Sequence, residues 1–321
     1  MSTGMVPLAP LPGGSRNLAL AVSSDGSVIT GQSLTTGRSG FQAFRWTEST
    51  GPIGLKDGGV DSRGYDISSD GSVIVGIDHI NSQIRPIQWA ESTGIVPLFP
   101  SSGGSNSSLA TRANTISGNG LVVGGNSVID NAISEAFVWS ESTGRIGLGD
   151  LPGGDFNSTV EDLTLDGSVA VGVGQVGATI ADSLGFIWTS ASGMTALEPL
   201  SGFGVSEAYG ISDDGRLIVG ASGNGAATTF SGTATIWDAD GSALSIQELL
   251  EAGGINMDGW QLVSAYEISG DGSTIIGIGI NPSGNREAWR ATINAVPEPS
   301  SLSLLGVIGA FTLLRRRRVV T

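Results

Sequence analysis

The sequence predicts an all-β repeat protein, and the architecture that best fits it is a β-propeller of six four-stranded blades. Two series of residues recur in step along the 321-residue chain: a tryptophan every 43 to 52 residues, and an Asp-Gly or Asn-Gly pair ahead of an apolar run. A unit of this length is the size of one propeller blade. We therefore divide the chain into a repeat domain, residues 1–294, and a tail, residues 295–321.

Each repeat contains signals for four short strands. Asp-Gly or Asn-Gly between two β-rich segments predicts a hairpin with a type I′ turn, which needs positive φ at both central residues. A third strand ends at the tryptophan, and a turn such as residues 141–144 (ESTG) leads into a short fourth strand. Because the pattern repeats in register, we expect the tryptophans to pack between blades and the turn aspartates to support the backbone instead of binding cations. The tryptophans are Trp46, Trp89, Trp139, Trp188, Trp237 and Trp289, and the turn pairs begin at Asp25, Asp70, Asn119, Asp166, Asp214 and Asp271.

The two ends of the repeat domain depart from the pattern. The last unit is longer than the others, contains residues 246–252 (IQELLEA) that could form one or two helical turns, and stops without a fourth strand. At the other end, residues 2–8 (STGMVPL) resemble a turn and a fourth strand with nothing before them. Joining the two ends would complete six blades and leave no exposed sheet edge. The alternative is an incomplete chain, since Met1 falls inside a repeat and no secretory leader precedes it.

The composition excludes several classes of function. The formal net charge of −15 opposes nucleic-acid binding by the repeat domain. Without cysteine, and with only His79, which we place in a solvated loop, the chain lacks the usual ligands for zinc and the elbow of a Ser-His-Asp relay. Gly172, Gly174 and Gly177 match a dinucleotide-binding spacing, but they belong to a strand and loop of the repeat and not to a βαβ unit. We predict no catalytic residue, no cofactor and no metal.

The repeats also carry longer matching segments. These include residues 67–76 (ISSDGSVIVG), 136–139 (AFVW) and 148–154 (LGDLPGG). In these segments the units resemble the HAF family of extracellular bacterial repeats, over about nine tenths of the chain. The resemblance implies a propeller-like architecture outside the cytoplasm, and it brings no catalytic residues with it.

The tail has three parts: a Pro-Glu-Pro element, an apolar stretch and a basic cluster. The apolar stretch, residues 302–314, would form a short C-terminal helix about 20 Å long, against about 30 Å of membrane hydrocarbon. The basic cluster would stay cytoplasmic and place the repeats across the membrane. An ordinary short anchor, or a helix packed on the domain, is the alternative. The Pro-Glu-Pro element comprises Val296, Pro297, Glu298 and Pro299. The apolar stretch contains Leu302, Leu304, Leu305, Val307, Ile308, Phe311, Leu313 and Leu314, and the basic cluster is Arg315, Arg316, Arg317 and Arg318.

In every part, and in its position at the C-terminal end, this tail resembles the PEP-CTERM sorting signal. The resemblance implies recognition by an exosortase, a membrane cysteine protease that cuts near the motif, in Gram-negative bacteria that produce exopolysaccharide. We therefore predict an exported, non-enzymatic surface or matrix protein, anchored briefly in the inner membrane through its tail. The predicted partners are the exosortase, the membrane and polysaccharide. The alternative is a glycan-active enzyme or lectin, which two carboxylates about 5 to 9.5 Å apart in the propeller funnel would favour.

Overall fold

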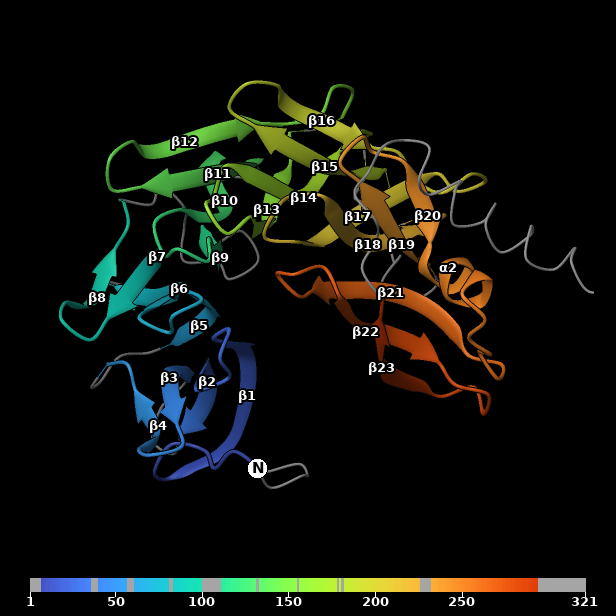
Figure 1. Cartoon of the computed structure of the whole chain (residues 1–321). Helices are drawn as coiled ribbons and strands as arrows, with labels where there is room; N and C mark the ends of the chain where they lie inside the picture. The colour runs from blue at the N-terminus through green and yellow to red at the C-terminus, as the bar shows by residue number, and fades with distance from the viewer. Residues whose placement is uncertain are drawn as a thin grey trace, which may run out of the picture.

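The computed structural model describes residues 7–293, except for 36–39, 57–60, 81–82, 100–110, 131–132, 155, 178, 180–181 and 226–231. These residues form six antiparallel sheets that succeed one another around a common axis (Figure 1). The protein is a six-bladed β-propeller with one short helix among the described residues, which confirms the predicted architecture.

Within each blade the strands pair in chain order, from the innermost strand outward. Blades 1 and 2 comprise β1 (Gly14–Val22), β2 (Val28–Thr35), β3 (Phe41–Thr47), β4 (Gly51–Gly54), β5 (Ser62–Ile67), β6 (Val73–Ile80), β7 (Gln83–Ala90) and β8 (Gly94–Pro97). Blades 3 and 4 comprise β9 (Arg112–Ile116), β10 (Val123–Asp130), β11 (Ile133–Ser140), β12 (Gly144–Gly149), β13 (Ser158–Leu163), β14 (Val169–Gln175), β15 (Ser183–Thr189) and β16 (Gly193–Leu197). Blades 5 and 6 comprise β17 (Val205–Ile211), β18 (Leu217–Gly223), β19 (Thr233–Asp238), β20 (Ala243–Ser245), β21 (Gln261–Ile268), β22 (Thr274–Ile280) and β23 (Arg286–Thr292).

The predicted hairpins are present between the first two strands of every blade, but their turns are not type I′. Gly26 has a φ of 73°, whereas Asp258 is the only non-glycine residue with positive φ in the described part of the chain. The loop from Ser23 to Val28 instead closes through the Gly26 N–H donating to the Ser23 carbonyl at 2.8 Å. The Asp25 carboxylate accepts from the Ser23 hydroxyl and the Ser27 N–H, so only glycine needs the left-handed conformation.

The core lies between neighbouring blades. Trp237 is fully buried, and its indole N–H donates to the Glu198 carbonyl at 2.8 Å. The other five tryptophans of the series are partly exposed. Four of them, Trp89, Trp139, Trp188 and Trp289, still pack against buried clusters formed by two neighbouring blades, as expected. The smaller aromatic residues Phe44, Phe137 and Phe186 are buried.

The last blade has the predicted departures. The helix α2 (Ile246–Ala252) follows β20 and is capped by Ser245, whose hydroxyl accepts from the Glu248 N–H. The sheet of blade 6 has three strands, β21 to β23, among the described residues. Residues 2–6 of the predicted closing strand lie outside the described residues, and residues 7–10 are not in a strand.

The six blades form an open ring. Close contacts link the innermost strands from β1 through β5, β9, β13 and β17 to β21. No comparable contact joins β21 back to β1 within the described residues, and Figure 1 shows a gap between blades 1 and 6. The described residues contain no helix long and apolar enough to cross a membrane. The predicted apolar helix, residues 302–314, lies outside them.

Candidate functional site

The innermost strand of every blade contains a bulge that leaves one extra residue unpaired. In β17, for example, the pairing with β18 passes from Ala208 to Gly210 and leaves Tyr209 unpaired. The extra residues are Leu20, Tyr65, Asn114, Glu161, Tyr209 and Tyr266. All three tyrosines of the chain therefore occupy this one position. Our sequence reasoning missed this site, although each bulge residue lies five positions before the turn Asp or Asn.

The residue after the bulge is acidic in alternate blades. Blades 2, 4 and 6 carry Asp66, Asp162 and Glu267, whereas blades 1, 3 and 5 carry the smaller residues Ala21, Thr115 and Gly210. A side chain at Gly210 would collide with Glu267 of the next blade, because a Cβ atom there would lie 3.1 Å from the Glu267 Cα. Each acidic side chain at this position therefore has a smaller residue at the same position in the adjacent blades.

Two of these carboxylates link their own blade to the next one. Asp66 accepts from the Ile67 N–H in its own strand and from the Ile116 N–H of blade 3, the latter at 2.8 Å. Asp162 accepts from the Leu163 N–H and from the Ile211 N–H of blade 5, also at 2.8 Å. Each acid thus bonds to backbone N–H groups of two successive blades, which holds the inner strands in register.

One hydroxyl lies between the first two acids. Thr115 Oγ1 is 3.1 Å from Asp66 Oδ2 and 3.4 Å from Asp162 Oδ1. These two oxygens are therefore no more than the sum of those distances apart, about 6.5 Å. This upper limit lies below the far end of the range of about 5 to 9.5 Å that the glycan-active alternative requires.

A second group of polar side chains comes from blades 4, 5 and 6. The Tyr209 hydroxyl donates to the Glu207 carboxylate, and the rings of Tyr209 and Tyr266 are 5.4 Å apart. Glu161 interacts electrostatically with Glu207 and with Arg112. The axis is thus lined by aromatic rings and carboxylates.

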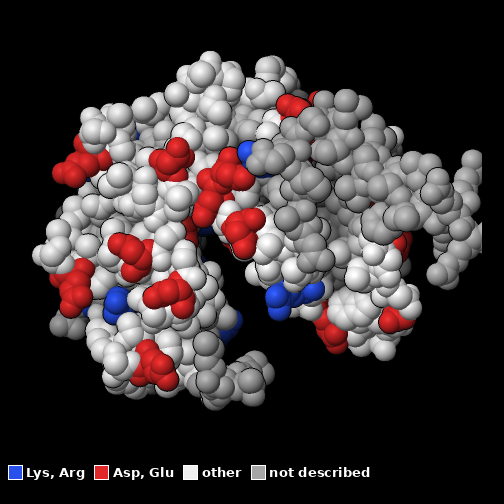
Figure 2. Space-filling model, viewed as in Figure 1, with Lys and Arg blue, Asp and Glu red and all other residues white. Residues whose placement is uncertain are grey.

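The acids at the axis hold protons more tightly than free carboxyls do. Burial raises the pKa of Asp162 to about 7, and repulsion from Asp66 adds to the effect. Burial raises the pKa of Glu161 to about 7 as well, with a contribution from Glu207. Glu267 keeps an exposed surface, yet the surrounding protein and the charge of Asp162 raise its pKa well above the usual range. Figure 2 shows the central hollow of the ring, with acidic side chains gathered along its upper wall.

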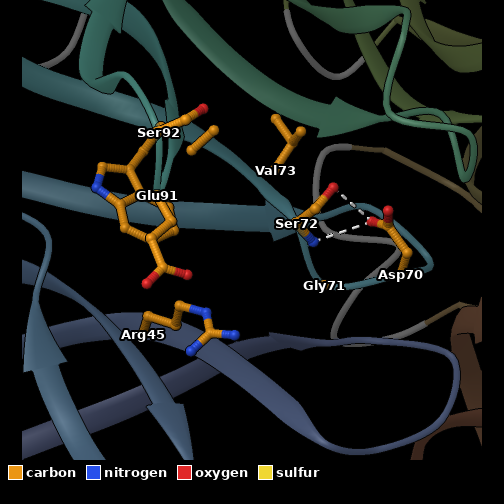
Figure 3. A pocket seen from close by; sticks show the side chains of 9 residues that line it. Arg45, Asp70, Gly71, Ser72, Val73, Glu91 and Ser92 are labelled. Atoms are coloured by element: carbon orange, nitrogen blue, oxygen red, sulfur yellow. Dashed lines mark hydrogen bonds between the residues drawn. The ribbon is translucent and has the colours of Figure 1, made fainter.

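A separate cavity of about 470 Å³ lies where blades 1 and 2 meet (Figure 3). Arg45 and Trp89 line it, together with the turn residues Asp70 and Ser72. Asp70 is already occupied, since its Oδ1 accepts from the Ser72 N–H and from both the Ser68 and Ser72 hydroxyls. No axial residue lines this cavity, so we place the candidate site at the axis.

The structure corrects the predicted position of one residue, His79. His79 lies at the end of β6, paired with Ile84, and not in a solvated loop, because β6 and β7 extend almost to their connection. Gly172 and Gly174 lie within the strand β14. This agrees with the expectation that they belong to a strand of the repeat and not to a dinucleotide-binding βαβ unit. No group of three or more metal-ligating side chains occurs among the described residues. The tail residues Val296 to Pro299, Leu302 to Leu314 and Arg315 to Arg318 lie outside them.

Comparison with known proteins identifies the tail. Residues 295–318 match the PEP-CTERM protein-sorting motif. The chain is thus an exported protein with a tail that associates transiently with the membrane and is processed by an exosortase. The resemblance of the repeats to the HAF family stays a prediction. None of the curated proteins compared with the chain matches it.

Solved structures support the fold. The chain is similar to TolB from Acinetobacter baumannii, with a TM-score of 0.51 and 18% identity over 70% of this chain and 52% of that one. It spans about half the length of that TolB. It is also similar to a putative TolB from Agrobacterium tumefaciens, with a TM-score of 0.53 and 13% identity over 88% of this chain and 92% of the other. The propeller domain of the Trilobed protease from Pyrococcus furiosus, which has an open velcro topology, gives a TM-score of 0.50 and 12% identity, over 89% and 83%.

Proposed function

We propose that the protein is a non-enzymatic binding propeller, residues 1–294, that reaches the cell surface or the exopolysaccharide after an exosortase removes its tail, residues 295–321. The observation that carries this proposal is the sorting motif at residues 295–318. The tail holds the protein briefly in the inner membrane. The propeller then presents its surface and its axial hollow to polysaccharide outside the cell.

The hydrogen bonds made by the axial acids support a non-enzymatic role. The oxygens of Asp66 and Asp162 accept from backbone N–H groups of two successive blades. A carboxylate that acts as nucleophile or general acid must turn its oxygens toward the substrate. Here those oxygens hold the ring together.

Replacement of Glu298 tests the sorting step. In a host with an exosortase and with a suitable leader, we expect Glu298→Ala to leave the protein uncut and retained in the inner membrane. Glu91→Ala, on an exposed turn of blade 2, is the matched control and should be processed normally. The measurement is the intact mass of the surface-located protein. Residues 302–321 still attached to that protein would contradict the proposal.

The proximity of the Asp66 and Asp162 carboxylates, which share the Thr115 hydroxyl, is the basis of a second candidate, a glycan-active enzyme or lectin that uses the axial hollow. Incubation with exopolysaccharide distinguishes the two forms of this candidate from each other and from the first. New reducing ends that disappear in Asp162→Asn would show hydrolysis. Binding without new reducing ends would show a lectin, which is compatible with the first proposal.

A further inference from the structure

The residue that precedes the tryptophan of one blade meets the tryptophan of the next blade. At three successive junctions, from blade 3 to blade 6, both side chains belong to one buried apolar cluster. The pairs are Val138 with Trp188, Ile187 with Trp237, and Ile236 with Trp289. An aliphatic residue at this position therefore fills the space in front of the next tryptophan.

Blades 1 and 2 depart from this pattern. Blade 2 has Gln88 at this position, and blade 1 has Arg45, which lies in β3 directly before Trp46. The cavity of about 470 Å³ lies where blades 1 and 2 meet, and both Arg45 and Trp89 of the next blade line it. Its volume is within the range of about 300 to 1,000 Å³ that is typical of small-ligand sites. A cation thus replaces the aliphatic residue at this junction, and an open cavity lies beside it.

The Arg45 guanidinium is available to a ligand. Among the described residues its side chain makes no hydrogen bond or ion pair and does not stack on an aromatic ring. Ala43, two residues earlier on the same face of β3, is fully buried in the core between blades 1 and 2. Arg45 continues that face outward, is half-buried, and offers N–H donors without an acceptor.

Blade 2 supplies an acceptor and an aromatic surface to the same cavity. Glu91 follows β7 on an exposed turn and directs its carboxylate toward Arg45, although no ion pair joins these two described residues (Figure 3). Trp89 packs on one side against the buried cluster between blades 1 and 2, which fixes the part of its ring that lines the cavity. Asp70, the other acid of the wall, is occupied by its own turn.

A sugar ring matches these three groups. Its hydroxyls can accept from Arg45 and donate to Glu91, and its C–H face can cover the indole of Trp89. An anionic sugar fits less well, because Glu91 balances the charge of Arg45 and the chain has a formal net charge of −15. The charges of the cavity therefore favour an uncharged sugar.

We propose that the cavity between blades 1 and 2 binds a neutral sugar unit of the polysaccharide, with Arg45 and Glu91 holding its hydroxyls and Trp89 its apolar face. This inference rests on the proposed function, a propeller that binds polysaccharide outside the cell. It places a sugar contact at a junction between blades, apart from the axial hollow.

Substitution of Arg45 tests the site. We expect the full chain to bind cellotriose, a neutral glucose trimer, in isothermal titration, and Arg45→Val to weaken binding about tenfold or more. Valine is the residue of blade 3 at this position, so the variant should fill the space in front of Trp89 and keep the Tm of the parent. Arg290→Val, at an exposed position of β23, removes the same charge and should bind like the parent.

Three results overturn the proposal. The parent does not bind cellotriose, or Arg45→Val binds it as tightly as the parent does, which would place the sugar elsewhere. In the third result, methyl β-glucuronide binds at least as tightly as methyl β-glucoside. These two sugars differ in one carboxylate, so that result would show an anion site at Arg45.

Glu91→Ala separates this proposal from the proposed function. The variant is the control for processing, so it should lose its tail normally and yet bind cellotriose more weakly, to a similar extent as Arg45→Val. Normal processing with undiminished sugar binding would overturn the sugar site alone. A parent protein that keeps its tail at the surface would contradict the sorting proposal alone, because titration measures sugar binding independently of processing.

Discussion

At the scale of single residues, the acids of this protein have two opposite environments. The turn acids Asp25 and Asp271 are fully solvated, and hydrogen bonds from the turn lower the pKa of each to about 2. The axial acids Glu161 and Asp162 have lost water, which raises the pKa of each to about 7. The first group stabilises the fold once ionised, whereas ionisation of the second group opposes it.

Because the pKa of Glu161 is higher in the folded protein than in the unfolded chain, its contribution to stability falls as the pH rises from about 4.5 to about 7. We expect Glu161→Gln to raise the Tm by about 3 °C at pH 8 and to leave it unchanged near pH 4. Thermal unfolding at both values is the measurement. A Tm gain of the same size at both values would contradict this account, and Glu141→Gln on an exposed turn is the control.

At the scale of elements, the hairpin turn is the feature that every blade repeats. The residue before the glycine accepts from a side-chain hydroxyl two positions back and from the N–H two positions ahead. In blade 3 Asn119 replaces aspartate and makes the same two bonds, at 2.8 and 3.0 Å. The turn therefore needs an acceptor oxygen and not a charge.

Substitution of a turn acid tests that conclusion. Asp70→Ala removes the acceptor for the Ser68 hydroxyl and the Ser72 N–H, and we expect a loss of about 1 kcal/mol in the free energy of unfolding. Asp70→Asn should cost less than half as much, as Asn119 already shows the geometry. Denaturant unfolding measures both. Equal losses for the two variants would mean that the carboxylate charge carries the effect.

At the scale of the whole molecule, an open ring of blades is joined to a sorting tail. The acidic axis and the tail lie in different parts of the chain, and the sorting motif accounts for delivery without the axial residues.

We expect the basic cluster of the tail to set its orientation. Replacement of Arg315 to Arg318 by serine removes the charges that favour the cytoplasmic side, and we expect the tail to slip through the membrane. Protease added outside the inner membrane would then cut the end of the tail in the variant but not in the parent. Protection of both proteins to the same extent would show that the arginines do not hold the orientation.

The repeats, the hairpins, the helical turns at residues 246–252 and the sorting motif could all be predicted from the sequence. Each of these is a local pattern: an Asp-Gly pair, an apolar alternation or a run such as Val296 to Pro299 can be recognised without distant residues. The turn type was predicted wrongly, because the acceptor role of Asp25 depends on a hydroxyl and an N–H that the dipeptide signal does not include.

Which residues come together near the axis could not be predicted from the sequence. Tyr65 and Tyr266 are 201 positions apart, and neither lies in a motif of its own. They occupy the same position in their blades because every inner strand bulges at the same place, and the blades succeed one another around one centre. The raised pKa of Asp162 likewise needs Asp66 from another blade and the loss of water between blades. These effects arise from convergence in space, which a repeat pattern along the chain does not specify.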